Sequence, residues 1–287
     1  MKIRILMLGI TLSLFVFGCS KEDNTSNNAS FTTEEAMVNS KIDVMNDDIS
    51  QIVEDNLTTD DGISGRNAQV FASCATVTRV PAYGTSPSVG TLITKTIDFG
   101  TTGCTLFNGN IVKGKIIISF VYDPNATSHT INYQFENFYH NNIKFDGNKS
   151  FTRVLSAATT ASPSHPIVTM NMNLTAMLPD GRVFTRIGTR VREIIEGYNT
   201  AIMSDNVYKI TGSWTTTFPN QNIQNSVITS PLIIKFSCAP QYSVLSKGII
   251  TFTRNNNTAT LDYGDGTCDN LAIFTINGNT FTIVLNN

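Results

Sequence analysis

The hydrophobic positions between residues 33 and 57 recur at alternating steps of four and three residues, the repeat of one helix face. This apolar stripe consists of Val38, Ile42, Met45, Ile49 and Ile52. Thr32 or Thr33 can cap the helix, and two glutamates follow in its first turn. An apolar stripe must be covered, so we expect the helix to pack on the protein's own sheet. A coiled coil or a partner contact is the alternative.

From residue 66 to residue 287 the pattern changes to short alternating runs that are separated by Asp-Gly, Asn-Gly and Asn-Asn turns. Alternation with a period of two predicts strands, and tight polar turns predict antiparallel neighbours. The fold class is therefore mainly β, with antiparallel sheets in a sandwich or an open barrel-like meander and one N-terminal amphipathic helix. Trp214, the only tryptophan, alternates with apolar residues and is expected in the core.

One hairpin can be placed by residue. Apolar side chains occupy the even positions from Val168 to Leu178, and Asp180-Gly181 then reverses the chain. With a two-residue turn, Leu178 faces Val183 and the even positions form a core face. The opposite face then carries four arginines: Arg182, Arg186, Arg190 and Arg192. Guanidinium groups bind carboxylates and phosphates, so this face is a candidate anion site; a solvated face paired with local acids is the alternative.

Charge divides the chain unevenly. From Lys21 to Asp61 there are eleven acids and two lysines, whereas the sequence after Arg66 is moderately basic. The two parts can attract each other electrostatically. This mild balance indicates no nucleic-acid partner.

Four cysteines follow residue 66, namely Cys74, Cys104, Cys238 and Cys268. They form two pairs, each spaced by 30 residues, which favours disulfides over a metal site with closer ligand spacing. Three connectivities are open, and we expect 74 with 104 and 238 with 268. Matching Ser-Cys-Ala, Asp-aromatic-Gly and Asn-Gly segments around each pair predict a duplicated unit at about 70–122 and 235–285.

The first residues have the pattern of an export signal. Lys2 and Arg4 precede a short apolar run that closes with Phe17-Gly18-Cys19. The run is too short to span a bilayer, which needs about 20 apolar residues. We therefore expect a signal peptide over 1–18, lipidation of Cys19, and a polar tether over 19–32.

The Phe-Gly-Cys site is similar to a bacterial lipobox, and the following Ser20-Lys21-Glu22-Asp23 resembles a surface-export signal. With the Ser-Cys-Ala and terminal Asp-Tyr-Gly-Asp-Gly-Thr-Cys-Asp-Asn segments, the chain resembles uncharacterised β-rich surface lipoproteins of Bacteroidota-type bacteria. The resemblance implies an acyl-anchored protein of the outer membrane that faces the cell exterior, with the periplasmic face as the alternative. It brings no known activity.

Motifs for catalysis and metal binding are missing from the sequence. The three histidines lack metal-ligand spacing, and Asp262, Asp265 and Asp269 break the alternation of a calcium loop, which favours a disulfide-held turn. No nucleophile elbow or phosphate loop occurs, and no cofactor is indicated. We expect a binding or scaffolding protein for an acidic glycan, lipopolysaccharide or an outer-membrane protein. A glycan hydrolase, or an accessory subunit of an outer-membrane complex that docks through the acidic helix, is the alternative.

Overall fold

The structure is a computed structural model that describes residues 31–57, 74–160, 163–200 and 202–285. Cys19, the leader and most of the predicted tether lie outside these residues. The described chain has one long helix, α1 (Thr33–Asp55), and one large sheet. In chain order the strands are β1 (Thr76–Val80), β2 (Leu92–Asp98), β3 (Cys104–Thr105), β4 (Ile111–Val121), β5 (Ser128–His140), β6 (Ile143–Leu155), β7 (Pro166–Met177), β8 (Val183–Glu196), β9 (Val207–Thr217), β10 (Ile223–Lys235), β11 (Leu245–Arg254), β12 (Asn257–Asp265), β13 (Leu271–Ile276) and β14 (Asn279–Val284).

The sheet is one antiparallel meander. Each strand pairs with its neighbour in the chain, except that β2 pairs with β4 and the short β3 lies beside β4 off this path. The sheet therefore runs from β1 at one end to β14 at the other. The predicted antiparallel β class is confirmed, in its open meander form rather than as a sandwich of two sheets.

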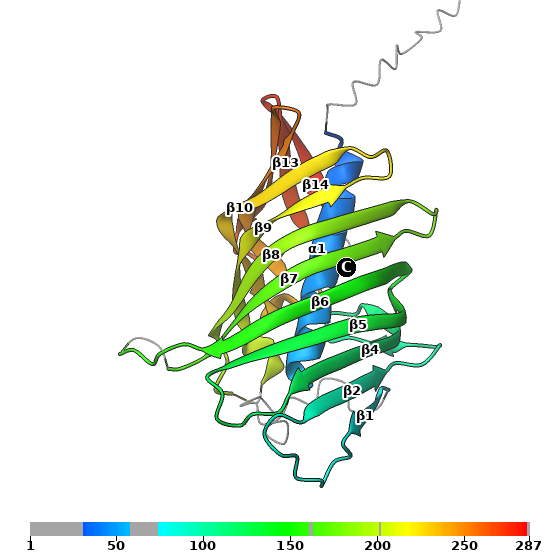
Figure 1. The fold of residues 1–287 in the computed structure, drawn as a ribbon. Helices are drawn as coiled ribbons and strands as arrows, with labels where there is room; N and C mark the ends of the chain where they lie inside the picture. Colours follow the sequence, from blue (N-terminus) through cyan, green and yellow to red (C-terminus); the bar gives the residue numbers. More distant parts are fainter. Residues whose placement is uncertain (1–30, 58–73, 161–162, 201, 286–287) are drawn as a thin grey trace, which may run out of the picture.

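The sheet curves around α1, which runs across the strands (Figure 1). Side chains from distant strands meet the helix. Lys95 on β2 contacts the backbone oxygen of Asn56, and Tyr263 on β12 lies 3.4 Å from Ser40. One apolar cluster joins the helix to strands from both ends of the sheet. The helix is therefore part of the core, as the apolar stripe predicts.

Local sequence explains where the helix begins. The Thr32 hydroxyl accepts from the Glu35 amide at 3.1 Å, and the Glu35 carboxylate accepts from the Thr32 amide at 3.2 Å, which is a capping box. Ile42, Ile49 and Ile52 are almost fully buried. Within the described ranges, no helix combines the length and apolarity needed to cross a lipid bilayer.

Disulfides join Cys74 to Cys104 and Cys238 to Cys268, which confirms the expected pairing. Each bond encloses a strand pair, β1–β2 or β11–β12, and is followed by a hairpin with an Asn-Gly turn, β3–β4 or β13–β14. The two units differ in pairing, because β2 lies next to β4 whereas β12 lies next to β13. Their common origin remains a prediction.

Candidate functional site

Three of the four arginines proposed for anion binding are inside the molecule. Arg186, Arg190 and Arg192 are between 1% and 3% exposed, and each contacts α1. Only Arg182 lies at the surface, in the β7–β8 turn, where it pairs with Glu34 and Asp180 at 2.7 and 2.8 Å. The prediction that all four share a solvent-facing side of the sheet is wrong.

The error comes from the turn. Leu178 and Arg182 close the hairpin, so the loop has three residues with Gly181 at a positive φ of 85°. Consequently Leu174 faces Arg186 and not Ile187, whose side chain is 63% exposed. A register shift of one residue moves every side chain of a strand to the other face of the sheet. Here it places the arginines on the face that packs against the helix.

The acids of α1 neutralise these arginines. Arg186 Nη1 and Arg190 Nη2 each lie 2.5 Å from Asp43 Oδ1, and Arg192 Nη1 lies 2.6 Å from Glu54 Oε1. Buried charges are tolerated when they are paired and hydrogen-bonded. The attraction predicted between the acidic N-terminal part and the basic remainder is therefore realised within one chain.

Aromatic rings on the neighbouring strand β9 pack against the same arginines. The Arg190 guanidinium lies 4.3 Å from the centre of the Trp214 ring, and that of Arg192 lies 3.6 Å from the Tyr208 ring. A Cβ at Gly188 would come within 2.4 Å of Trp214 Cβ, so this position requires a glycine. Each guanidinium lies close to both a carboxylate and a ring, which suits its planar, weakly hydrated charge. These arginines are structural.

Two other buried groups have pKa values close to neutral. Burial raises the pKa of Asp47 to about 6, even though Arg190 lowers it. Burial has the opposite effect on Lys149, whose pKa it lowers to about 7. The Lys149 ammonium donates to the Asn46 side-chain oxygen. The charge of the interior therefore changes near neutral pH.

A polar network extends from the interior towards the surface. Asp48 accepts from Asn108 at 2.8 Å and from Asn110 at 2.9 Å, and His140, the last residue of β5, lies 2.7 Å from the same carboxylate. Asn141 donates to Asn110 at 2.9 Å. These bonds fix the β3–β4 and β5–β6 turns relative to the helix, and so fix the wall of an adjoining groove.

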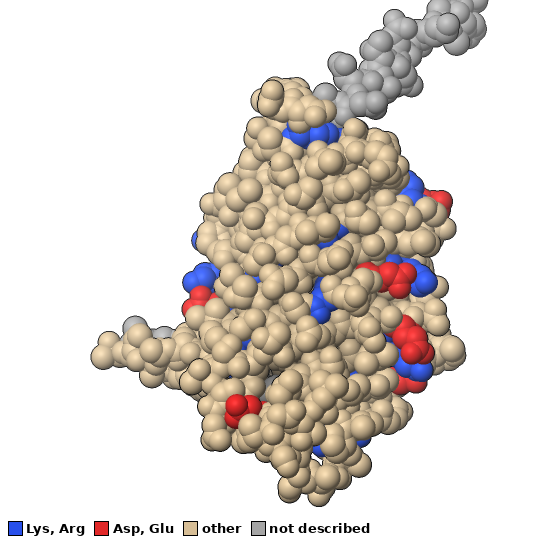
Figure 2. All heavy atoms as spheres, in the orientation of Figure 1, with Lys and Arg blue, Asp and Glu red and all other residues tan. Residues whose placement is uncertain are grey.

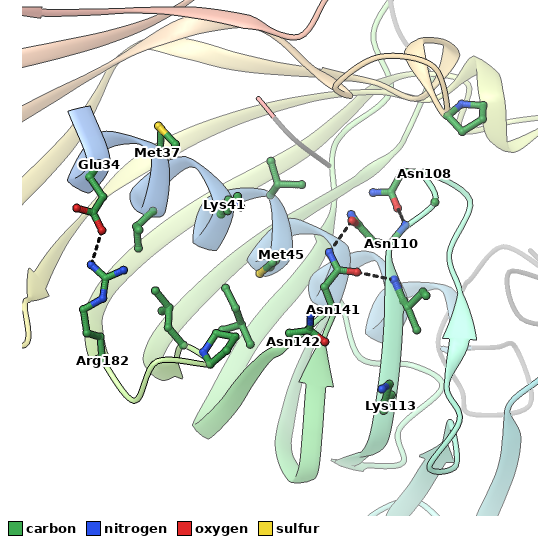
Figure 3. A pocket seen from close by; sticks show the side chains of 18 residues that line it. Glu34, Met37, Lys41, Met45, Asn108, Asn110, Lys113, Asn141, Asn142 and Arg182 are labelled. Carbon is green, nitrogen blue, oxygen red and sulfur yellow. Dashed lines mark hydrogen bonds and ion pairs between the residues drawn. The ribbon is translucent and has the colours of Figure 1, made fainter. Parts of the chain in front are cut away.

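The groove lies between the exposed side of the N-terminal half of α1 and these turns (Figure 3). Its volume is about 840 Å³, within the range of small-molecule sites. The apolar part of its lining consists of Met37, Val38, Val44, Met45, Ile111, Ile143, Leu178, Pro179 and Pro240. The polar part consists of Glu34, Lys41, Asn108, Asn110, Lys113, Asn141, Asn142 and Arg182.

The charges of the groove are not all compensated. Arg182 is paired with Glu34, and this ion pair closes the end of the groove near the helix N-terminus (Figure 3). Lys41 and Lys113, on the helix and on β4, make no ion pair or side-chain hydrogen bond with another residue of the described ranges. The groove thus combines an apolar surface with two available ammonium groups and several amides.

A Ser-His-Glu cluster lies beside β8, and its hydrogen bonds show whether the serine can act as a nucleophile. The two ring nitrogens of His165 lie 3.2 Å from the Ser156 hydroxyl and 3.0 Å from Glu193. The nitrogen facing Ser156 also lies 2.8 Å from the Pro163 carbonyl, which only accepts hydrogen bonds, so this nitrogen carries a proton and donates to the carbonyl oxygen. That nitrogen has no lone pair to accept the serine proton, so this geometry does not make a nucleophile. The cluster fastens the β6–β7 loop instead.

The aspartates of the calcium-like segment hold turns. The carboxylates of Asp262, Asp265 and Asp269 each accept a hydrogen bond from the backbone amide two residues further along the chain. The N···O distance is 2.9 Å in every case. Among the described residues, no group of three or more His, Cys, Asp or Glu side chains could hold a metal ion. The geometry agrees with the predicted disulfide-held turn.

The groove residues were missed by sequence reasoning. In the sequence, Asn108 and Asn110 stand out only as part of an Asn-Gly turn, and Lys41 only as one of the two lysines of the acidic N-terminal part. The one available signal was the concentration of Asn at turns whose strands turn out to be neighbours. Comparison of the chain with protein-family models, curated proteins and solved structures finds no match.

Proposed function

We propose that this protein is an acyl-anchored binding protein of a bacterial outer membrane, facing the cell exterior, and that the groove holds its ligand. The observation that carries the proposal is the groove itself, with its apolar lining and the ammonium groups of Lys41 and Lys113, which have no ion-pair partner among the described residues. A ligand that fits this chemistry has an apolar body and an anionic group.

The buried charges narrow the choice of binding surface. The arginines of β8 are occupied by helix carboxylates, so an anion in solution does not meet them. Likewise, Asp43 and Glu54 are not available to dock an outer-membrane partner through the acidic side of α1. The groove, in contrast, has accessible cationic groups next to apolar side chains.

Binding can be tested with dodecanoate, which has a carboxylate and an apolar chain, against the full chain by isothermal titration calorimetry. Dodecanol provides the uncharged comparison. Lys41→Glu together with Lys113→Glu should weaken dodecanoate binding by about tenfold or more, because two attractive contacts become repulsive. Lys247→Glu is the matched control, since Lys247 lies on β11 outside the groove.

Three outcomes would contradict this assignment: no saturable binding of dodecanoate, an equal loss in Lys247→Glu, or equal affinity for dodecanol. The anchor has a separate test. Labelled palmitate should enter the wild type and not Cys19→Ala, and protease added to intact cells should digest the protein if it faces outward. Absence of label from the wild type would reject the anchor but not the groove.

A further inference from the structure

The outer face of the sheet carries an uninterrupted row of uncharged polar residues. Paired positions on β2, β4, β5, β6, β7, β8 and β9 place one such side chain on each strand, in the order Thr94, Ser119, Asn132, Ser150, Asn171, Thr189 and Ser213. Their chain neighbours point inward and most are buried. Neighbouring strands are about 4.8 Å apart, so the row extends for roughly 29 Å.

The first five residues of this row, from Thr94 on β2 to Asn171 on β7, line a shallow hollow of about 610 Å³. A second set of amides, Gln134, Asn148 and Asn173, widens it on one side. Among the described residues, these three amides and that of Asn132 make no side-chain hydrogen bond, so their donors and acceptors are free for a ligand. The amide of Asn171 is engaged only by Thr189, at 3.5 Å.

The charges of this face lie around the hollow rather than in it. Ion pairs such as Lys115–Glu136 and Lys144–Asp146 are at one end of the strands, and Lys209–Glu193 is at the other. Figure 2 shows the face as largely uncharged, with its acidic residues towards the margins and a few Lys or Arg atoms visible near the middle. Lys149 reaches the hollow, but its ammonium is directed to Asn46 on the helix and its side chain is buried.

We infer that the outer hollow over β2 to β7 is a second binding site, for an extended uncharged glycan. We call this hollow the amide row. Carboxamides and hydroxyls both donate and accept, as sugar hydroxyls require. The one cation of its described lining, Lys149, is buried, which disfavours an acidic ligand. Amides outnumber the apolar side chains of this lining, which disfavours a lipid. The strand spacing is close to the length of one sugar unit in an extended chain, so one unit can meet each strand.

The test uses neutral, extended cellohexaose and β-1,4-mannohexaose against the full chain by isothermal titration calorimetry. An acidic hexagalacturonate is the charged comparison. Asn132→Leu combined with Asn171→Leu keeps similar side-chain size but removes the hydrogen-bonding groups. We expect this variant to lose about tenfold in affinity for the neutral hexasaccharide that binds.

Asn225→Leu is the matched control, because Asn225 is exposed on β10, outside the hollow. Its affinity should stay within about twofold of the wild type. Unchanged thermal melting of both variants would show that the sheet is intact, as expected for exposed positions. The proposal is overturned if neither neutral probe binds, if Asn225→Leu weakens binding as much as the double variant, or if hexagalacturonate binds more tightly.

Discussion

The two faces of the sheet use polar residues in opposite ways. On the inner face, Arg186, Arg190 and Arg192 are charged, buried and paired with helix carboxylates. On the outer face, Asn132 and Asn171 are uncharged and exposed. The arginines, which in the sequence suggest anion binding most strongly, therefore hold the molecule together, whereas the amides of the outer face are accessible to a ligand.

The physical reason is the cost of leaving a charge without a partner. A buried guanidinium must be neutralised locally, so its position fixes how the helix lies in the sheet. An exposed amide is satisfied by water until a ligand replaces that water. Inner-face substitutions should therefore change stability, and outer-face substitutions should change binding alone.

The strongest test of this contrast is Arg190→Met. Removing one partner leaves Asp43 and Asp47 with less compensation in the interior, so we expect a loss of about 3 to 5 kcal/mol in the free energy of unfolding. Urea denaturation measures it. Arg182→Met is the control, because its exposed ion pairs should contribute less than about 1 kcal/mol. Equal losses in the two variants would show that burial does not matter here.

The disulfides test whether the two ends of the sheet are equivalent. Cys74→Ser with Cys104→Ser, and Cys238→Ser with Cys268→Ser, open loops of the same length. The chain-entropy account predicts that each double variant loses about 3 to 4 kcal/mol. Thermal and urea unfolding should show similar shifts for both. A loss confined to one variant would mean that packing, not loop closure, determines the contribution of that end.

Lys149 makes the inner face sensitive to pH. Its pKa is about 7 in the folded protein and near its usual 10.5 when unfolded, so the unfolded state holds the extra proton between these values. Stability should therefore rise by about 2 kcal/mol between pH 7 and pH 9. Lys149→Met should remove this rise, while Lys144→Met, on the same strand but with a partly exposed side chain, should keep it. A wild-type profile that is flat over this range would contradict the assignment.

The smallest effect is expected at His165. The Pro163 carbonyl and Glu193 raise the pKa of this side chain, despite partial burial. A raised pKa means that the folded state holds the proton more tightly, so the contribution is complete below the ordinary value and is lost as pH rises through the folded value. Thermal melting of His165→Gln should differ from the wild type at pH 5 and converge with it at pH 8. The opposite order would refute the loop-fastening role.

Much of the fold could be predicted from the sequence because its signals are local. Helical periodicity and a capping threonine define α1, and alternation with turn residues defines the antiparallel strands. Equal cysteine spacing indicated the correct disulfide pairs, since each bond closes one strand pair and its loops. The leader and Cys19 are likewise read locally, and their roles remain predictions.

The groove and the amide row could not be predicted, because both join residues that are distant in the chain. Lys41 and Lys113 line the same groove only because the sheet curves around the helix, and Asn132 and Asn171 share a face with Ser150 between them. The face of the sheet on which the arginines lie depends on whether the β7–β8 turn has two or three residues. Local sequence patterns do not determine this turn length reliably. Local sequence signals are enough to specify the helix, the antiparallel strands and the disulfide pairs. Which polar residues are buried follows from the folded arrangement, because burial depends on strand register and on the curvature of the sheet.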